Sequence, residues 1–202
     1  DVYYAHRDDP ATPVEETMEA FDRLIRAGKV RAVGASNLRV WRIAEANTAS
    51  RIHGWNQYCA VEQRHTFLRP RHGADFGPQI PINEDLQDYC AARGITLVAY
   101  SILLQGAYTR PERRLPAQYA GPDSEERLEA LRAVATECGA TPSQVIIAWM
   151  LQSKPPVLPI IAGSRLEQLK ENLAAAGVTL THDQMQRLDT AGNPDIRQAW
   201  LR

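Results

Sequence analysis

The sequence has few cysteines, no long hydrophobic run and no block of like charge, and each absence excludes a class of protein. Its three cysteines, Cys59, Cys90 and Cys138, are widely spaced without a CxxC pair, which predicts buried, unreactive thiols in a reducing compartment. The apolar runs are far shorter than a membrane span. The formal net charge of −1 argues against a phosphate-backbone partner such as DNA. We therefore expect a cytoplasmic, globular protein that binds neither a membrane nor nucleic acid.

Two common nucleotide-binding motifs are also missing. Neither GxGxxG nor GxxxxGK[ST] follows any strand-like segment, which argues against a Rossmann fingerprint and a P-loop. What the chain does contain is an alternation of apolar, strand-like runs with helical segments bounded by capping residues, Thr12 being the expected cap of the first helix. The expected strands cover residues 1–6, 30–34, 57–62, 95–100 and 157–161. The expected helices cover residues 13–27, 38–49, 83–92, 124–138, 142–152, 165–176 and 183–191.

This alternation predicts an α/β fold in which helices cover a parallel sheet. A barrel is favoured over the doubly wound folds because the nucleotide motifs of those folds are absent. A complete (β/α)₈ TIM barrel has about 250 residues and eight strands, whereas this sequence contains five strand-like runs. We expect residues 1–202 to form one partial barrel domain, with roughly three N-terminal β/α units of about 90–110 residues missing. Such an open arc exposes two edges, which predicts marginal stability and self-association through the incomplete barrel.

Polar residues follow the expected strands at the point where each strand ends. The carboxyl ends of parallel strands are where α/β proteins place their binding and catalytic groups. We therefore expect a site at this end of the sheet. The residues concerned are His6, Ser36, Asn37, Gln63, Tyr100, Ser101, Gly163, Ser164 and Arg165.

The most informative segment is Val157–Leu173, where an apolar run is followed by a Gly-Ser-Arg turn and an amphipathic helix. The start of a helix presents free N–H groups and a positive dipole end, which together favour an anion. Gly163 permits close backbone approach, Ser164 offers a hydroxyl, and Arg165 offers a guanidinium suited to phosphate. The alternative is that Ser164 only caps the helix and Arg165 is an ordinary surface residue.

Five segments, in order along the chain, resemble the aldo-keto reductase family. The resemblance covers essentially the whole chain, and it places these residues in strands four to eight of that family's barrel. The third segment, Val61-Glu62-Gln63, resembles the sixth-strand glutamine region. The other four are DVYYAHRDDP, GKVRAVGASNL, LVAYSILLQG and IAGSRLEQLKENL.

The resemblance implies a barrel that binds NADPH, with NADH as the less favoured cofactor, and that needs no metal. At the nicotinamide end, Tyr100 would stack on the ring, and Ser101 follows it in the same motif. Ser36, Asn37 and Gln63 would hydrogen-bond the carboxamide.

At the other end of the cofactor, the Gly-Ser-Arg turn would hold the adenosine 2′-phosphate, and Arg165 would give the preference for NADPH. Gly163 and Ser164 complete that turn. The residues implied around the adenine are Gln168, Glu171 and Asn172.

Carbonyl reduction needs a hydride donor, an acid for the carbonyl oxygen and donors that stabilise the developing oxyanion. In the resembled family the acid is a tyrosine tuned by a lysine and an aspartate, and a histidine orients the carbonyl. His6 matches that histidine, whereas Tyr4 is interpreted as a core residue. The aspartate, tyrosine and lysine belong to the three β/α units that we expect to be missing. The expected function is therefore the cofactor-binding portion of an NADP(H)-dependent oxidoreductase that reduces an aldehyde or ketone, with this chain inactive alone.

Two alternatives remain open at this point. The chain could be a non-catalytic nicotinamide-nucleotide-binding remnant or regulatory subunit, or it could belong to a phosphate-binding TIM-barrel enzyme of another class. The substrate is expected to be a small carbonyl compound, enclosed by the loops at residues 64–81 and 101–122. Side chains expected within reach of it are Trp55, Arg64, His65, Phe67 and Tyr108.

Overall fold

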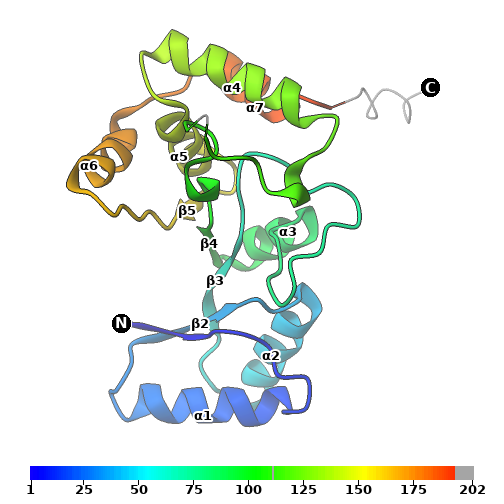
Figure 1. Cartoon of the computed structure of the whole chain (residues 1–202). Coiled ribbons are helices and arrows are strands. Elements are labelled where there is room, and N and C mark those ends of the chain that lie inside the picture. Colours follow the sequence, from blue (N-terminus) through cyan, green and yellow to red (C-terminus); the bar gives the residue numbers. More distant parts are fainter. Residues whose placement is uncertain (111, 194–202) are drawn as a thin grey trace. The chain divides into compact units, whose positions relative to one another are not determined.

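The computed structural model of the chain describes residues 1–110 and 112–193 (Figure 1). Its centre is a five-stranded sheet in which the strands lie in sequence order. The pairs β1–β2, β2–β3 and β3–β4 are parallel. This order has no reversal, unlike the order of a doubly wound sheet. The strands are β1 (Val2–Ala5), β2 (Ala32–Ser36), β3 (Tyr58–Arg64), β4 (Thr96–Tyr100) and β5 (Val157–Pro159).

The chain divides into two compact units. Unit 1 comprises Asp1–His65, Gly77–Tyr100 and Pro155–Leu158. The described part of unit 2 comprises Thr66–Phe76, residues 101–110 and 112–154, and residues 159–193.

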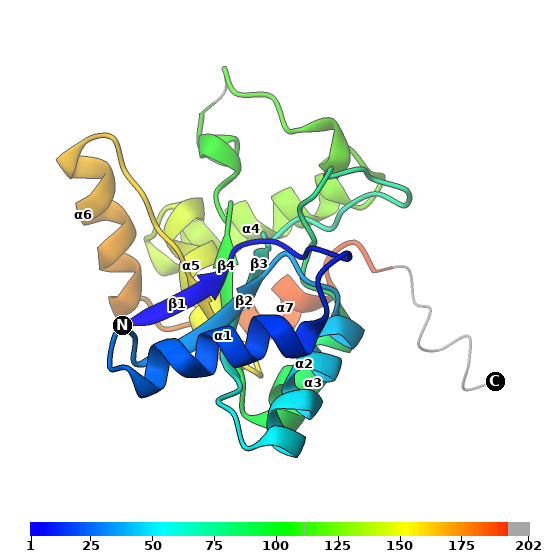
Figure 2. The same ribbon diagram turned by 90° about the horizontal axis from the view of Figure 1, so that it is seen from below.

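In unit 1 three helices lie along the outside of the strands, α1 (Val14–Arg26), α2 (Val40–His53) and α3 (Glu84–Arg93) (Figure 2). Helix α1 has Glu15 and Glu16 in its first turn and arginines in its last, the charge order that the helix dipole favours. The core of unit 1 includes small and branched apolar side chains with no exposed surface. They include Val33, Ala35, Ile43, Val61 and Ala99.

Unit 2 is built on α5 (Pro142–Gln152), which is apolar on nearly every side and therefore buried. A capping box at Thr141 and Gln144 begins this helix. It contacts α4 (Ser124–Cys138) and α6 (Leu166–Ala174), and α7 (His182–Thr190) contacts α4. Short 3-10 turns lie at Leu104–Gly106, Ala117–Tyr119 and Ala175–Gly177.

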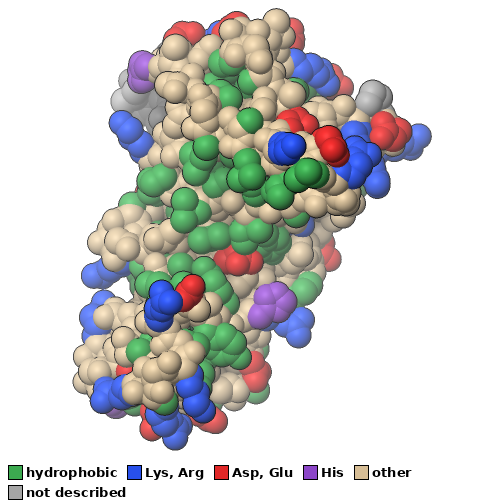
Figure 3. Space-filling view, turned by 90° about the vertical axis from the view of Figure 1, so that its left-hand side faces the viewer, with side chains coloured by type: hydrophobic (Ala, Val, Ile, Leu, Met, Phe, Trp, Pro, Cys, Tyr) green, Lys and Arg blue, Asp and Glu red, His purple; other side chains and the backbone are tan. Residues whose placement is uncertain are grey.

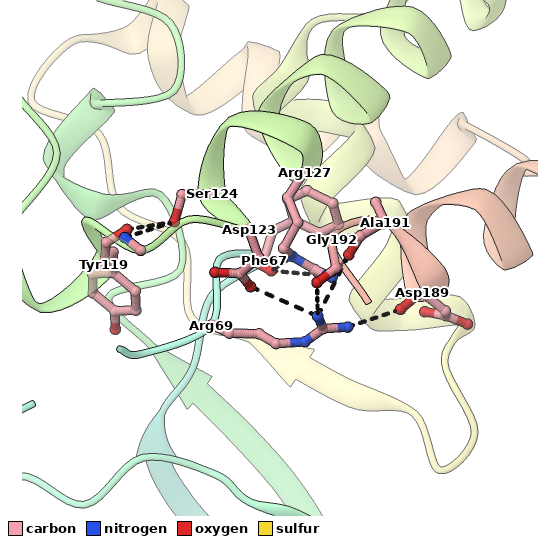
Figure 4. Close-up of polar contacts among 10 residues, drawn as sticks. Phe67, Arg69, Tyr119, Asp123, Ser124, Arg127, Asp189, Ala191 and Gly192 are labelled. Atoms are coloured by element: carbon pink, nitrogen blue, oxygen red, sulfur yellow. Dashed lines mark hydrogen bonds and ion pairs between the residues drawn. The ribbon is translucent and has the colours of Figure 1, made fainter. Parts of the chain in front are cut away.

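A buried arginine ties the end of α7 to the rest of unit 2 (Figure 4). Arg127 is 3% exposed, and its guanidinium donates two bonds to the Phe67 carbonyl and one to the Ala191 carbonyl. Arg69 donates to the carbonyls of Asp189 and Gly192 and pairs with Asp123 at 3.7 Å. Burial, and next the nearby Arg69 charge, lower the pKa of Arg127 to about 10. Together the two arginines satisfy carbonyls that the helix itself leaves free.

Both units expose large hydrophobic side chains, and Figure 3 shows a face rich in them. In unit 1, Val2 and Tyr3 on β1 are 43% and 51% exposed. In unit 2, α6 exposes three leucines at the spacing of one helix face, Leu166, Leu169 and Leu173. Within the described residues, none of the helices has the length and apolar character needed to cross a membrane.

Several expected features differ from the structure at their ends. Strand β2 lies two residues later than expected, because its parallel pairing with β3 continues to Ser36 while the amide of Lys29 is bonded to the end of α1. Strand β5 ends at Pro159 and not at residue 161. Thr12 does not cap α1, because Pro13 occupies the N-cap position; the Thr12 hydroxyl donates to Asp9.

The cysteines also correct one expectation. Cys90 is buried, and burial raises the pKa of its thiol to about 12. Cys59 is exposed, because it alternates along β3 with the buried Tyr58 and Ala60 and therefore faces the other side of the sheet. The three thiols are therefore not uniformly buried.

Candidate functional site

The residue after β2, Asn37, connects the ends of four strands in unit 1. Its backbone is left-handed, with a φ of 56°, a conformation that asparagine tolerates better than most residues. Its amide nitrogen donates to the His6 carbonyl (3.2 Å) and to the Ser36 hydroxyl (3.0 Å). Its side-chain oxygen accepts from the Ile80 amide (3.2 Å) and from the Tyr100 hydroxyl (2.7 Å). Two donor hydrogens and two lone pairs are therefore all in use.

Gln63 holds the same turn from the next strand. Its Oε1 accepts from the backbone N–H of Asn37 at 2.9 Å, and its Nε2 donates to the Leu38 carbonyl at 2.6 Å. The side chain has no exposed surface, and Ser36 is only 1% exposed. We call Ser36, Asn37, Gln63 and Tyr100 the Asn37 network.

The remaining predicted residues of unit 1 are more accessible. His6 follows β1 and is exposed, with its backbone carbonyl bonded to Asn37. Tyr100, at the end of β4, is half-buried. Four strand ends thus bring His6, Ser36, Asn37, Gln63 and Tyr100 together, as their positions in the sequence predicted.

The other predicted residues lie in unit 2, around a cavity of about 660 Å³. The loop after β4, the turn after β5 and the first turns of α6 form its walls. We call it the α6 cavity. Predicted residues that line it are Ser101, Gly163, Ser164, Arg165, Gln168, Glu171 and Asn172.

The turn that leads into α6 is held by side chains of the helix itself. Gln168 Oε1 accepts from both the backbone N–H and the hydroxyl of Ser164, each at 3.1 Å. Asn172 is 6% exposed and donates to the Ala162 carbonyl at 3.2 Å. A Cβ on Gly163 would lie 3.0 Å from the Leu169 nitrogen, so glycine lets the turn pack closely on the helix. Arg165 is the N-cap residue, and Ser164 is not.

Glu171 is held at the edge of the same cavity. Its carboxylate accepts from the Thr141 hydroxyl at 2.8 Å, and its backbone carbonyl accepts from Gln144 at 3.0 Å. The capping box of α5 thus also fixes a wall of the cavity.

The α6 cavity contains a second arginine that the sequence analysis did not identify. Arg110 lies in the loop after β4 and also lines the cavity. Among the described residues, neither the Arg110 nor the Arg165 guanidinium has a hydrogen bond or an ion pair. The only carboxylate in the lining is that of Glu171, so the cavity carries an excess of positive charge. A signal was present in the sequence, an arginine soon after the Tyr-Ser motif, but the irregular loop hid its position.

That loop is unusual in its backbone. Ser101, Leu104 and Gln105 all have positive φ values, between 46° and 58°, which costs energy in each case. It is anchored by Tyr108, whose hydroxyl is buried. The Leu68 amide donates to that hydroxyl at 3.1 Å, and Thr66 uses its own proton on the Ile102 carbonyl at 2.6 Å. The Tyr108 hydroxyl therefore donates to Thr66, at 2.7 Å.

Two side chains expected within reach of a substrate are committed to packing. Phe67 and Tyr108 are 1% and 7% exposed. The aromatic face of Phe67 lies against the Arg127 guanidinium, 4.2 Å from ring centre to the guanidinium carbon. Burial raises the pKa of Tyr108, so its hydroxyl stays protonated.

The chain is 28% identical over 195 residues to norsolorinic acid reductase stcV of Emericella nidulans, covering 94% of this chain and 48% of that protein. It is 27% identical over 202 residues to an aryl-alcohol dehydrogenase, GME11368, of Pestalotiopsis microspora, covering 97% and 50%. The chain thus spans about half the length of the curated relatives it matches.

A solved structure shares the fold. The thermostable aldo-keto reductase Tm1743, crystallised with the inhibitor epalrestat, superposes with a TM-score of 0.73 at 29% identity, covering 95% of this chain and 59% of that one. The model of the aldo/keto reductase family matches residues 1–193. The chain belongs to the aldo/keto reductase family.

Proposed function

We propose that the chain is the cofactor-binding portion of an NADP(H)-dependent oxidoreductase that reduces an aldehyde or a ketone to an alcohol. Aldo/keto reductases in general use NAD(P)H. The observation that carries the proposal is the α6 cavity, with two guanidiniums that have no partner among the described residues. Unpaired cations in a cavity of about 660 Å³ suit a ligand with more than one anionic group.

The turn before α6 suits the 2′-phosphate of NADPH. Arg165 stands at the start of the helix, where a phosphate is favoured by both the guanidinium and the helix dipole. Gln168 and Asn172 hold the turn in place, so little conformational freedom is lost on binding. NADH lacks this phosphate and should bind less tightly.

When bound, the nicotinamide would supply the hydride for carbonyl reduction. The chain's own residues would then bind the nicotinamide and orient the substrate. Tyr100 would offer its ring to the nicotinamide while Asn37 holds its hydroxyl, and His6 would donate to the carbonyl oxygen of the substrate. We propose that further β/α units, in the same or another chain, complete a (β/α)₈ barrel and bring the proton-donating acid. The name of one relative, an aryl-alcohol dehydrogenase, favours an aromatic carbonyl substrate.

The test is nucleotide binding by calorimetry, with NADPH, NADH and glucose 6-phosphate offered to the same protein. We expect NADPH to bind, NADH to bind more weakly, and the sugar phosphate not to bind. Loss of the charged contacts in Arg165→Ala should weaken NADPH by about ten- to a hundredfold and leave NADH unchanged. Arg110→Ala should weaken both nucleotides.

The control is Arg114→Ala, which removes an exposed arginine of the same loop that does not line the cavity. It should leave all affinities unchanged. Binding of glucose 6-phosphate without a preference for NADPH would replace this proposal with a phosphate-binding barrel of another class.

A further inference from the structure

Another cavity, of about 380 Å³, lies in unit 1. Its walls are the segment after β1, the first turn of α2 and residues 77–80 of the loop that leads to α3. We call it the Trp41 pocket, after a tryptophan of that first turn. None of the residues that line it also lines the α6 cavity, so the two are separate cavities in separate units.

The walls of the Trp41 pocket are held together by hydrogen bonds within unit 1. Arg42 of α2 has a side chain only 12% exposed, and it donates to the Asp8 carboxylate at 3.1 Å. The same guanidinium donates to two backbone carbonyls of the segment after β1, at 3.2 and 2.6 Å. The remaining wall is fixed where the Ile80 N–H donates to Asn37 at 3.2 Å. The pocket is therefore formed before a ligand enters it, which lowers the cost of binding.

The Trp41 pocket carries an excess of positive charge. Asp8 is the only carboxylate in its lining, and it is paired with Arg42. Arg7 and Arg39 also line the pocket, and neither guanidinium has a hydrogen bond or an ion pair among the described residues. A guanidinium presents a planar set of donors that matches a carboxylate. The nearby Asp8 charge repels a second negative charge on the ligand, which favours a carboxylate over a phosphate dianion.

Trp41 adds an aromatic surface to the pocket. Its side chain is 59% exposed. The two other tryptophans that the structure describes have aromatic partners, since Trp55 stacks on His53 and Trp149 meets Phe67, with ring centroids 4.4 and 5.5 Å apart. Trp41 has no aromatic partner within the described residues. An indole that faces a cavity in this way can stack on a planar ring.

We propose that the Trp41 pocket binds an aromatic carboxylate, whose ring lies against Trp41 and whose carboxylate is held by Arg7 and Arg39. A cavity of about 380 Å³ suits a compound of one or two rings. Pro10 and Pro78 add apolar surface on two of the walls. The inference does not depend on the proposed function, because it uses no residue of the α6 cavity.

The test is calorimetry with 2-naphthoate and three analogues, offered to the whole chain without nucleotide. 2-Naphthamide keeps the rings but has no charge, and it should bind at least about tenfold more weakly than 2-naphthoate. Decahydro-2-naphthoate keeps the charge but has no aromatic ring, and it should bind about three- to tenfold more weakly. 2-Naphthyl phosphate should also bind more weakly, because of the Asp8 charge.

Substitutions then locate the bound 2-naphthoate. Arg7→Ala and Arg39→Ala should each weaken its binding by about tenfold. The matched control is Arg93→Ala, because Arg93 is an exposed arginine of unit 1 that also has no partner among the described residues but does not line the pocket. Trp41→Leu should weaken binding by about three- to tenfold, whereas Trp41→Phe, which keeps an aromatic ring, should retain most of the affinity.

Because the substituted side chains are exposed, these variants should keep the urea midpoint of the unchanged protein. Equal affinities for 2-naphthoate and 2-naphthamide, or tighter binding of 2-naphthyl phosphate, would overturn the inference. So would a loss of 2-naphthoate binding in Arg165→Ala with none in Arg39→Ala, since that result places the compound in the α6 cavity. If the unchanged protein binds no 2-naphthoate, the inference fails, whether or not NADPH binds.

Discussion

In the Asn37 network of unit 1, the amides of Asn37 and Gln63 are bonded to other groups of the protein, whereas in the α6 cavity of unit 2 two guanidiniums have no partner among the described residues. The network residues Ser36 and Gln63 are almost fully buried, while Arg165 is exposed. The first arrangement fixes geometry, and the second leaves charge available. Predicted site residues therefore divide into those that shape the site and those that can hold a ligand.

The difference follows from what each group costs when it is left alone. Leaving a buried amide without a hydrogen-bond partner costs about 1–3 kcal/mol. The amides of Asn37 and Gln63 avoid this cost because other groups of the protein bond to them. An exposed guanidinium is solvated by water and loses little when unpaired. It can therefore remain unpaired until an anion binds, at a small cost in stability.

The largest difference that we expect between the Asn37 network and the α6 cavity is in the free energy of unfolding of their variants. Asn37→Ala should lower the free energy of unfolding by about 3–5 kcal/mol, because it removes four side-chain hydrogen bonds and places alanine at a φ of 56°. Arg165→Ala should change it by less than about 0.5 kcal/mol. Urea denaturation of both variants measures the difference, and equal losses would contradict the division into shaping and binding residues.

A glycine variant separates the two contributions in this prediction. Asn37→Gly loses the same four hydrogen bonds but adopts the left-handed backbone without strain. It should be more stable than Asn37→Ala by about 1 kcal/mol. If the alanine variant were the more stable one, the strained turn would not be what Gln63 holds.

A smaller effect tests whether fully bonded and unpaired groups differ because of the sites they form or because of the unit in which they lie. Unit 2 has its own saturated cluster at Arg127, away from the α6 cavity lining (Figure 4). Arg127→Met should lower the free energy of unfolding by about 2–4 kcal/mol, because the carbonyls of Phe67 and Ala191 lose their donors. NADPH affinity of the folded protein should stay within about twofold.

Arg187→Met is the matched control for that variant, since Arg187 is partly exposed and pairs with Glu137 on the surface. Its effect on the urea midpoint should be much smaller. A large loss of nucleotide affinity in Arg127→Met would show that the cluster shapes the cavity and does not only hold α7.

The bounds of a helix could be predicted from the sequence where nearby capping residues begin or end it. Helices α4 and α5 have the expected bounds, because α5 begins with a Thr-Pro cap and α4 ends at Gly139 in the left-handed conformation. Strand β2 was misplaced because its end depends on pairing with β3, which is separated from it by a whole helix. The Thr12 prediction was wrong because Pro13 occupies the N-cap position, which leaves Thr12 outside the helix with its hydroxyl bonded to Asp9.

For the candidate site, sequence position identified which residues meet but not what they do. The positions of His6, Asn37 and Tyr100 at the ends of β1, β2 and β4 predicted that they meet. Three of the four partners of the Asn37 amide, His6, Ile80 and Tyr100, come from distant segments, and no local pattern contains that information. Arg110 was missed for a related reason, because its place follows from three positive φ values in residues that rarely adopt them.

The smallest expected effect concerns the loop after β4, which Tyr108 anchors in unit 2. Tyr108 does not line the α6 cavity, yet its hydroxyl joins Thr66 and Leu68 to the strained loop that forms one wall. Tyr108→Phe should lower the free energy of unfolding by about 1 kcal/mol and weaken NADPH binding by about threefold, because an unanchored loop must be ordered on binding. Tyr58→Phe, at a buried tyrosine of unit 1, controls for the general cost of losing a buried hydroxyl. Calorimetry with both variants decides the point: equal affinities for NADPH in the two would mean that the loop is held by its own backbone, and that binding in unit 2 depends on exposed charge alone.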